Sequence, residues 1–210
     1  QDCNVQESSF KMCDFSKSDL RDSVFVEVNF KQAVLHSADL SGAFIKDSVL
    51  SEIVGDLCNF SYANMSGSNL KGAKLHICDF TACRSLGIMA EESDFTGSEF
   101  SGAHLDSSKL QGTILNFCNF SEASLQECDL SRAKLFSATL KNARLNSSSL
   151  NSVTMIGAKV VGADLKYVNL DKANLTMANL SNSDFKGSSM NGVLEHDTIF
   201  DGANLEGVTK

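Results

Sequence analysis

Cysteine and histidine are the residue types in this chain with the most chemical potential, and the cysteines follow a strict spacing. All seven occupy the same slot of a five-residue period: Cys3, Cys13, Cys58, Cys78, Cys83, Cys118 and Cys128. A free thiol packs as a small hydrophobe, so an odd number in one slot indicates core positions. No spacing among them resembles a zinc site. We therefore expect buried, reduced cysteines and a reducing compartment such as the cytoplasm.

The histidines, serines and glycines do not form a recognisable catalytic or binding motif. His36, Asp56 and His76 follow one another at intervals of 20 residues, but a metal ion needs more ligands than these three positions supply. No serine stands in a nucleophile elbow, and no glycine-rich loop could hold a phosphate. The sequence predicts no catalytic residue, no cofactor and no metal site.

The elements that must position these residues follow from a five-residue repeat that runs through the whole chain. Of the 42 positions whose number is a multiple of five, 37 hold Leu, Phe, Met, Val or Ile. The position two residues earlier is small in nearly every unit, and 13 of the 14 glycines stand two residues after the large one. A helix face recurs every 3.6 residues and a strand face every two, so neither explains a period of five.

A chain that turns the same way every five residues closes after four sides. One coil then has about 20 residues, and coils stack like parallel strands about 4.8 Å apart. The chain would form about 10 coils, in a rod about 50 Å long. Phe60, Phe80, Phe100 and Phe120 would stack as an offset ladder of rings in the core.

Units such as Ala38-Asp39-Leu40-Ser41-Gly42 and Ala173-Asn174-Leu175 are similar to the A(D/N)LXX motif of the pentapeptide repeat family. The resemblance implies an all-β fold, a right-handed quadrilateral parallel β-helix, as a single domain over residues 1–210. This chain departs from the most regular members in using much Ser and Cys at the small slot and Phe at many centres.

Five central positions break the pattern, namely Gly55, Ser85, Ala90, Glu195 and Lys210, and the first three lie well inside the chain without shifting its phase. Gly55 lacks a large side chain, and Ser85 and Ala90 are two consecutive weak centres. Because the repeat resumes in phase on both sides, we expect a local packing irregularity and no inserted loop. Ile88 is expected to fill the volume that Ala90 leaves.

Composition and charge exclude several classes of protein. A hydrophobic content of 42 % with a net charge of −8 does not fit a disordered chain. No apolar run approaches the roughly 20 residues of a membrane span, and the acidic balance argues against direct nucleic-acid binding. A solid rod has no cleft for catalysis, so we do not expect an enzyme.

Outward-facing apolar residues that the repeat does not require favour a protein-binding scaffold rod. Leu57, Ile77, Gly97 and Phe117 share one predicted outer column, and scattered surface apolars are the alternative interpretation. The candidate partner-binding residues are Leu57, Tyr62, Ile77, Phe117, Glu91, Glu92, Asp94 and Glu99.

The runner-up hypothesis is DNA mimicry. Some pentapeptide repeat proteins resemble B-DNA in size and charge and bind DNA gyrase or topoisomerase IV in its place. Residues 91–130 hold eight acids against one lysine, but residues 131–186 hold eight bases against three acids, which breaks the match. Members of this type are dimers joined through a C-terminal helix, which the repeats continuing to Leu205 do not predict here.

The two ends of the chain carry no predicted cap. Solenoids need polar caps because open strand edges invite pairing, so an end-to-end homodimer is one expectation. The chain begins with Gln1, and we expect a fragment or processed chain, such as the repeat domain of a larger protein. Secreted bacterial effectors and proteins of photosynthetic organisms both resemble this arrangement, and the choice between them stays open.

Overall fold

The five-residue spacing places two side chains of each unit in the interior. In the computed structural model, which describes residues 2–210, Ala38 and Leu40 are buried while Asp39 between them reaches the surface. The same alternation of buried, outward and buried positions continues from Ser23 to Met190, except at Ser124, whose outward position is buried as well. The small and the large residue of each unit therefore form one continuous core along the chain.

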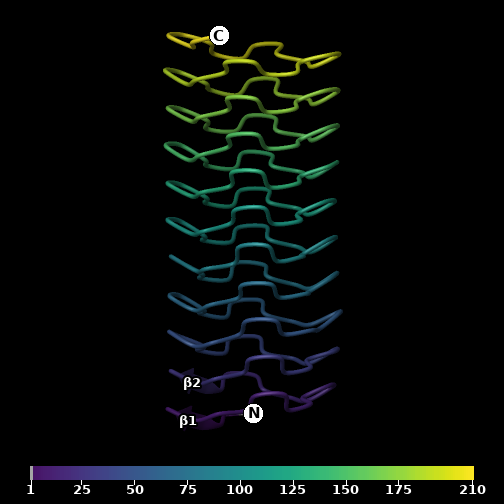
Figure 1. Ribbon diagram of the computed structural model, residues 1–210, viewed down its shortest axis with the longest axis vertical. Coiled ribbons are helices and arrows are strands. Elements are labelled where there is room, and N and C mark those ends of the chain that lie inside the picture. The colour runs from purple at the N-terminus through teal and green to yellow at the C-terminus, as the bar shows by residue number, and fades with distance from the viewer. Residues whose placement is uncertain (1) are drawn as a thin grey trace.

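Backbone hydrogen bonds join each coil to the one that begins 20 residues later. Strands β1 (Asn4–Gln6) and β2 (Val24–Val26) pair in parallel, with Asn4 opposite Val24. Single parallel bridges continue this register in four columns as far as the pair Ser189–Thr209. Figure 1 shows the chain rising as a stack of coils from the N-terminus to the C-terminus. The predicted pairing of positions 20 apart is confirmed, and residues 2–210 contain no helix.

The predicted ladder of phenylalanine rings is also confirmed. The ring centroids of Phe60 and Phe80 are 5.0 Å apart, those of Phe80 and Phe100 are 4.6 Å apart, and those of Phe100 and Phe120 are 4.8 Å apart. All three pairs are stacked, with ring planes within 9° of parallel. Phe95 packs edge-on against Phe80 and Phe100, which locks the ladder to the neighbouring wall.

Serine and cysteine fit the small slot because their polar atoms find backbone partners there. The Ser93 hydroxyl donates to Leu70 O at 2.7 Å, and the Cys118 thiol donates to Phe95 O at 3.0 Å. Each partner lies in the previous coil, 23 residues earlier. A buried hydroxyl without a partner would cost about 1–3 kcal/mol, so this bond makes the substitution for alanine tolerable.

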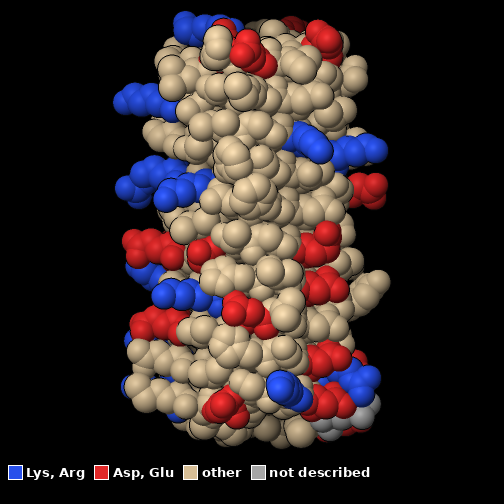
Figure 2. All heavy atoms as spheres, turned by 90° about the vertical axis from the view of Figure 1, so that its right-hand side faces the viewer, with Lys and Arg blue, Asp and Glu red and all other residues tan. Residues whose placement is uncertain are grey.

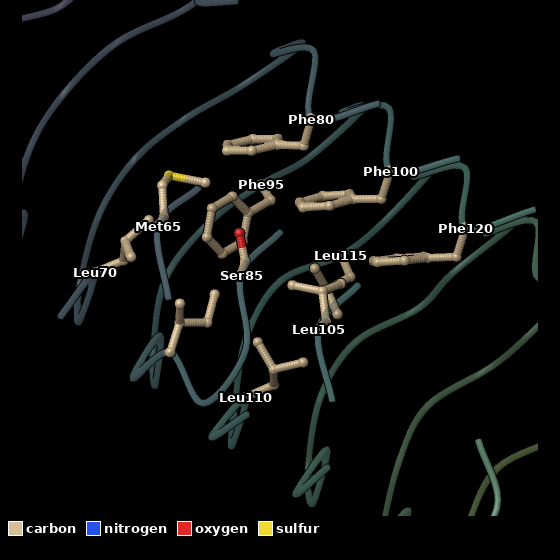
Figure 3. A pocket seen from close by; sticks show the side chains of 11 residues that line it. Met65, Leu70, Phe80, Ser85, Phe95, Phe100, Leu105, Leu110, Leu115 and Phe120 are labelled. Atoms are coloured by element: carbon tan, nitrogen blue, oxygen red, sulfur yellow. The ribbon is translucent and has the colours of Figure 1, made fainter. Parts of the chain in front are cut away.

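Neighbouring side chains fill most of the space at the weak centres Ser85 and Ala90. The register between coils continues through both positions. A cavity of about 10 Å³ remains beside Ser85, lined by Ile88, Phe80 and Phe95 among others. Figure 3 shows the rings of Phe80, Phe100 and Phe120 stacked beside this space and Ser85 among the side chains that line it. A water molecule needs about 10–15 Å³, so almost no empty volume is left. Ile88 is buried in a small slot and is one of the residues that line this cavity.

Gly55 leaves no hole either. A Cβ atom added there would lie 2.6 Å from Cys58 Sγ and 3.1 Å from Leu35 Cβ. The Cys58 thiol is held in this place by donating to Leu35 O at 2.8 Å. The sulfur atom therefore fills the space that a larger side chain occupies in other units.

This packing predicts that Gly55→Ala destabilises the protein by about 1–3 kcal/mol, because overpacking a full core forces neighbours to move. Combining it with Cys58→Ala removes the clashing sulfur, so the double variant should lose less than the sum of the two single losses. Urea unfolding of all four proteins measures this coupling. Strictly additive losses would contradict the proposed contact.

Candidate functional site

One edge of the rod carries large apolar side chains that face solvent. Its turns lie one above another because Leu57 N–H donates to His76 O at 3.0 Å and Phe117 N–H donates to Phe136 O at 2.9 Å. The side chains of Leu57, Ile77 and Phe117 are 60 %, 62 % and 58 % exposed. Together with Phe136 we call these residues the apolar edge.

Backbone conformation holds these side chains outward. Leu57, Ile77 and Phe117 all have positive φ, at 60°, 54° and 61°. Glycine occupies the same turn position in many other coils, for example Gly97 with a φ of 74°. Among the described residues with positive φ, Ile77 alone is β-branched, and such a residue is a genuine outlier there. Positive φ recurs at this turn position throughout the repeat, so the conformation belongs to the fold and the large apolar side chains are what distinguish this edge.

Phe117 and Phe136 form an aromatic pair on this edge. Their ring centroids are 5.4 Å apart with an interplanar angle of 83°. The pair bridges two successive coils and leaves both rings exposed. Phe136 is missing from the residues predicted from the sequence. The available signal was a large apolar residue directly after Leu135, at a turn position that is polar in most units.

Histidine and aspartate side chains line the edge beside Leu57 and Ile77. His76 bridges two carboxylates, with Nδ1 2.8 Å from Asp56 Oδ1 and Nε2 3.3 Å from Asp94 Oδ2. His36 Nδ1 accepts a hydrogen bond of 3.0 Å from Asp56 N–H. Partial burial raises the pKa of Asp94, but hydrogen bonds from Thr96 and His76 outweigh this and lower it. Asp94 is therefore a carboxylate at neutral pH.

The remaining predicted residues lie around the apolar edge and not on it. Asp94 belongs to the wall on one side, and Glu99 belongs to the wall on the other side, in the bridge column that continues to Asn119. Glu91 and Glu92 form the turn before Asp94, and Tyr62 is exposed on the next edge along the chain. The apolar edge is thus flanked by acids, and Tyr62 faces a different direction.

Two basic side chains meet at a shallow surface hollow near the upper part of the same edge. The hollow has a volume of about 320 Å³ and is lined by Lys141, Lys159, Gly157 and Met177 among others. Neither lysine has an ion-pair partner within residues 2–210. Two uncompensated positive charges therefore face solvent here.

The cysteines have the environment that their slot predicts, except at the N-terminal end. Five are buried, namely Cys58, Cys78, Cys83, Cys118 and Cys128. Cys3 and Cys13 are exposed, because the core is thin at the first coil. Within residues 2–210 no group of three or more His, Cys, Asp or Glu side chains could hold a metal ion.

Comparison with known families identifies the repeat. The profile described as pentapeptide repeats matches in eight copies, over residues 1–51, 56–84, 90–116, 113–151 and 148–187. The chain belongs to the pentapeptide repeat family. The breaks between matches fall at Gly55 and at Ser85, where the central residue is not large. No curated protein sequence matches this pentapeptide repeat protein.

Several solved pentapeptide repeat structures are similar to it. A trypsin-treated variant of QnrB1, a plasmid-mediated fluoroquinolone resistance protein, has 20 % identity and a TM-score of 0.51, covering 96 % of this chain and 89 % of that one. HetL of the cyanobacterium Nostoc, involved in heterocyst differentiation regulation, has 25 % identity and a TM-score of 0.46 over 98 % and 88 %. A protein of the Arabidopsis thaliana thylakoid lumen has 32 % identity and a TM-score of 0.39 over 47 % and 65 %. The likeness to QnrB1 shows a shared β-helix fold.

Within residues 2–210 the structure has no helix long and apolar enough to cross a membrane.

Burial raises the pKa of Cys83, Cys118 and Cys128 to about 12. We expect a disulfide reagent at pH 8 to modify Cys3 and Cys13 rapidly and the other five only after denaturation. Rapid modification of all seven native thiols would contradict the buried assignment. The unfolded chain ionises its thiols above about pH 9, while the folded state keeps their protons. The free energy of unfolding should therefore fall as the pH rises from 9 towards 12.

Proposed function

We propose that this pentapeptide repeat protein is a non-catalytic rod that binds a protein partner through its apolar edge. The observation that carries the proposal is the run of Leu57, Ile77 and Phe117, each more than half exposed, along one line of stacked turns. Contiguous exposed apolar surface of this kind marks interaction sites. Pentapeptide repeat proteins are generally structural or binding proteins and not enzymes, which agrees with this role.

The backbone supports the same interpretation. Glycine would occupy the positions of Leu57, Ile77 and Phe117 without conformational cost, as it does at Gly97. A large apolar side chain at such a position destabilises the folded chain in two ways. Its backbone is in an unfavourable left-handed conformation. Its apolar surface is also exposed to water. A partner that covers these side chains would recover the hydration part of this cost.

The columns of turns support a rigid presentation of the edge. Four columns of bridges, all between residues 20 apart, support the right-handed four-walled rod of about ten coils that the family resemblance implies. In such a rod the spacing between Leu57 and Phe117 is set by backbone hydrogen bonds and does not depend on side-chain packing. The partner would therefore meet a preorganised surface and lose little free energy in ordering it.

The test is a variant with Leu57→Ser, Ile77→Ser and Phe117→Ser. We expect it to lose capture of the partner in a cross-linking pull-down, and its thermal unfolding should change little, because exposed substitutions are usually within about 0.5 kcal/mol each. The matched control carries Met12→Ser and Tyr167→Ser, which are equally exposed and also have positive φ but lie on other edges. Unchanged capture by the triple variant would exclude this edge as the binding site.

A second candidate function, DNA mimicry, is favoured by one observation. Glu91, Glu92, Asp94 and Glu99 fall within nine residues of one another, in a 40-residue section that has seven net negative charges. Duplex DNA carries about six charges over the same two coils, at one per 1.7 Å. The relative QnrB1 is a fluoroquinolone resistance protein, which makes DNA gyrase the partner to test. The basic section that follows limits the match to these coils.

Supercoiling by purified DNA gyrase distinguishes the two candidates. We expect no inhibition by the wild-type protein, because its charge reverses sign after about two coils. A control variant converts Glu91, Glu92, Asp94 and Glu99 to their amides. Inhibition by the wild type that disappears in this variant would favour DNA mimicry over the apolar edge.

A further inference from the structure

We propose that the occupant of the apolar edge is a second, antiparallel copy of the same chain, related by a twofold axis that passes between Phe117 and Phe136. The inference rests on the proposed function, since it takes the apolar edge to be a docking surface and names its partner. In such an isologous interface each residue of one copy meets its symmetry counterpart on the other. The surface must therefore be complementary to itself when its long axis is reversed.

The apolar edge has this property. Starting from the aromatic pair, the next turn below Phe117 contains Gly97, and the next turn above Phe136 contains Ile156. Reversal about the pair places Ile156 of the second copy over Gly97, and Gly97 of the second copy over Ile156. An added Cβ at Gly97 would have Ile77 Cγ1 as its nearest neighbour, at 3.5 Å, which is an ordinary contact distance, so the surface around the glycine is not crowded. The half-buried side chain of Ile156 thus faces the small residue Gly97 twice in the interface.

One coil further out, the match continues. Ile77 lies below Gly97, and Met177 lies at the corresponding height above Ile156. Both side chains are more than half exposed. Reversal brings Ile77 of one copy to the height of Met177 of the other, so apolar surface meets apolar surface at both ends of the contact.

The wall beside the edge is also complementary to itself in charge. Its bridge column reads Asp79, Glu99, Asn119, Thr139 and Lys159, which is acidic at one end, neutral in the centre and basic at the other end. Antiparallel reversal places Glu99 of one copy opposite Lys159 of the other, and the pair forms twice. The hollow lined by Lys141 and Lys159 lies at this height and offers two cations without partners in the single chain.

The distribution of charge over residues 91–186 agrees with this arrangement. Residues 91–130 have eight acids and one base, whereas residues 131–186 have eight bases and three acids. In Figure 2 the Lys and Arg side chains predominate between the middle of the rod and its upper end, and acids predominate around and below the middle. Phe117 and Phe136 stand on either side of the boundary between these sections. A parallel arrangement would instead place like charges side by side, which is unfavourable.

Exchanging the two charges tests the arrangement. Sedimentation equilibrium of the wild type, from low micromolar to submillimolar protein, should show a monomer–dimer equilibrium that weakens with salt. Glu99→Lys alone and Lys159→Glu alone each create two like-charge pairs, so each should weaken the dimer at least about tenfold. The double variant Glu99→Lys/Lys159→Glu restores both pairs and should recover the dimer. Glu27→Lys, an exposed change on another edge, is the matched control.

Mixing the two single variants gives the most specific result. In a mixed dimer, both contacts between positions 99 and 159 again join opposite charges, so the mixture should associate although neither variant does so alone. A general loss of folding or solubility could not produce this recovery. Failure of both the mixture and the double variant to associate would overturn the proposal.

The outcomes separate this inference from the proposed function. A wild type that stays monomeric throughout the concentration range overturns the antiparallel dimer. If the triple variant at Leu57, Ile77 and Phe117 then still loses partner capture, the edge binds a different protein and the proposed function stands. A dimer that survives Phe117→Ser also overturns the antiparallel arrangement, because that substitution removes the centre of the contact.

Discussion

The backbone hydrogen bonds between coils are the interaction on which the rest of this structure depends. Phe60 N–H donates to Asp79 O at 2.6 Å, and Asp79 N–H donates to Cys58 O at 2.9 Å; equivalent bonds recur on every side of the coils. Because they always join a residue to the next coil, they force residues 20 apart into one column. The neighbours of each side chain below and above it are therefore the residues 20 positions earlier and 20 positions later, in the core and on the surface.

This constraint decides which residues the interior can hold. Parallel strands are about 4.8 Å apart, which is close to the 4.6–5.0 Å between the stacked rings from Phe60 to Phe120, so phenylalanine can repeat in one column without strain. In the small slot, a hydroxyl or thiol lies within reach of a carbonyl 23 residues earlier, as Ser93 and Cys118 illustrate. The unusual content of Phe, Ser and Cys is thus compatible with the same backbone as Leu and Ala.

Features that follow from the period could be predicted from the sequence, and features that depend on contacts across columns could not. The register of 20, the phenylalanine ladder and the shared column of Leu57, Ile77 and Phe117 need only the period of five. The sulfur of Cys58 in the space beside Gly55 depends on a side-chain direction. Phe136 is at the first position of its turn and contacts Phe117, which is at the second position of the turn below. His76 lies in a turn and contacts Asp94 in the neighbouring wall. The period of five predicts contacts within one column and does not predict contacts between columns.

In a solenoid, the position of a residue along the chain sets its height along the rod axis. The order of residues on one wall of the surface is therefore their order in the sequence. In a globular domain, residues that lie close on the surface come from scattered segments, so self-complementarity cannot be judged by comparing a sequence with its own reversal. Here the axial order of Asp79, Glu99, Asn119, Thr139 and Lys159 is their order along the chain. A sign change of charge along the chain thus becomes a dipolar surface, and an antiparallel pair of rods is the arrangement that brings its opposite charges together. The aromatic pair stands where the sign changes, so the electrostatic and the apolar contributions select the same register.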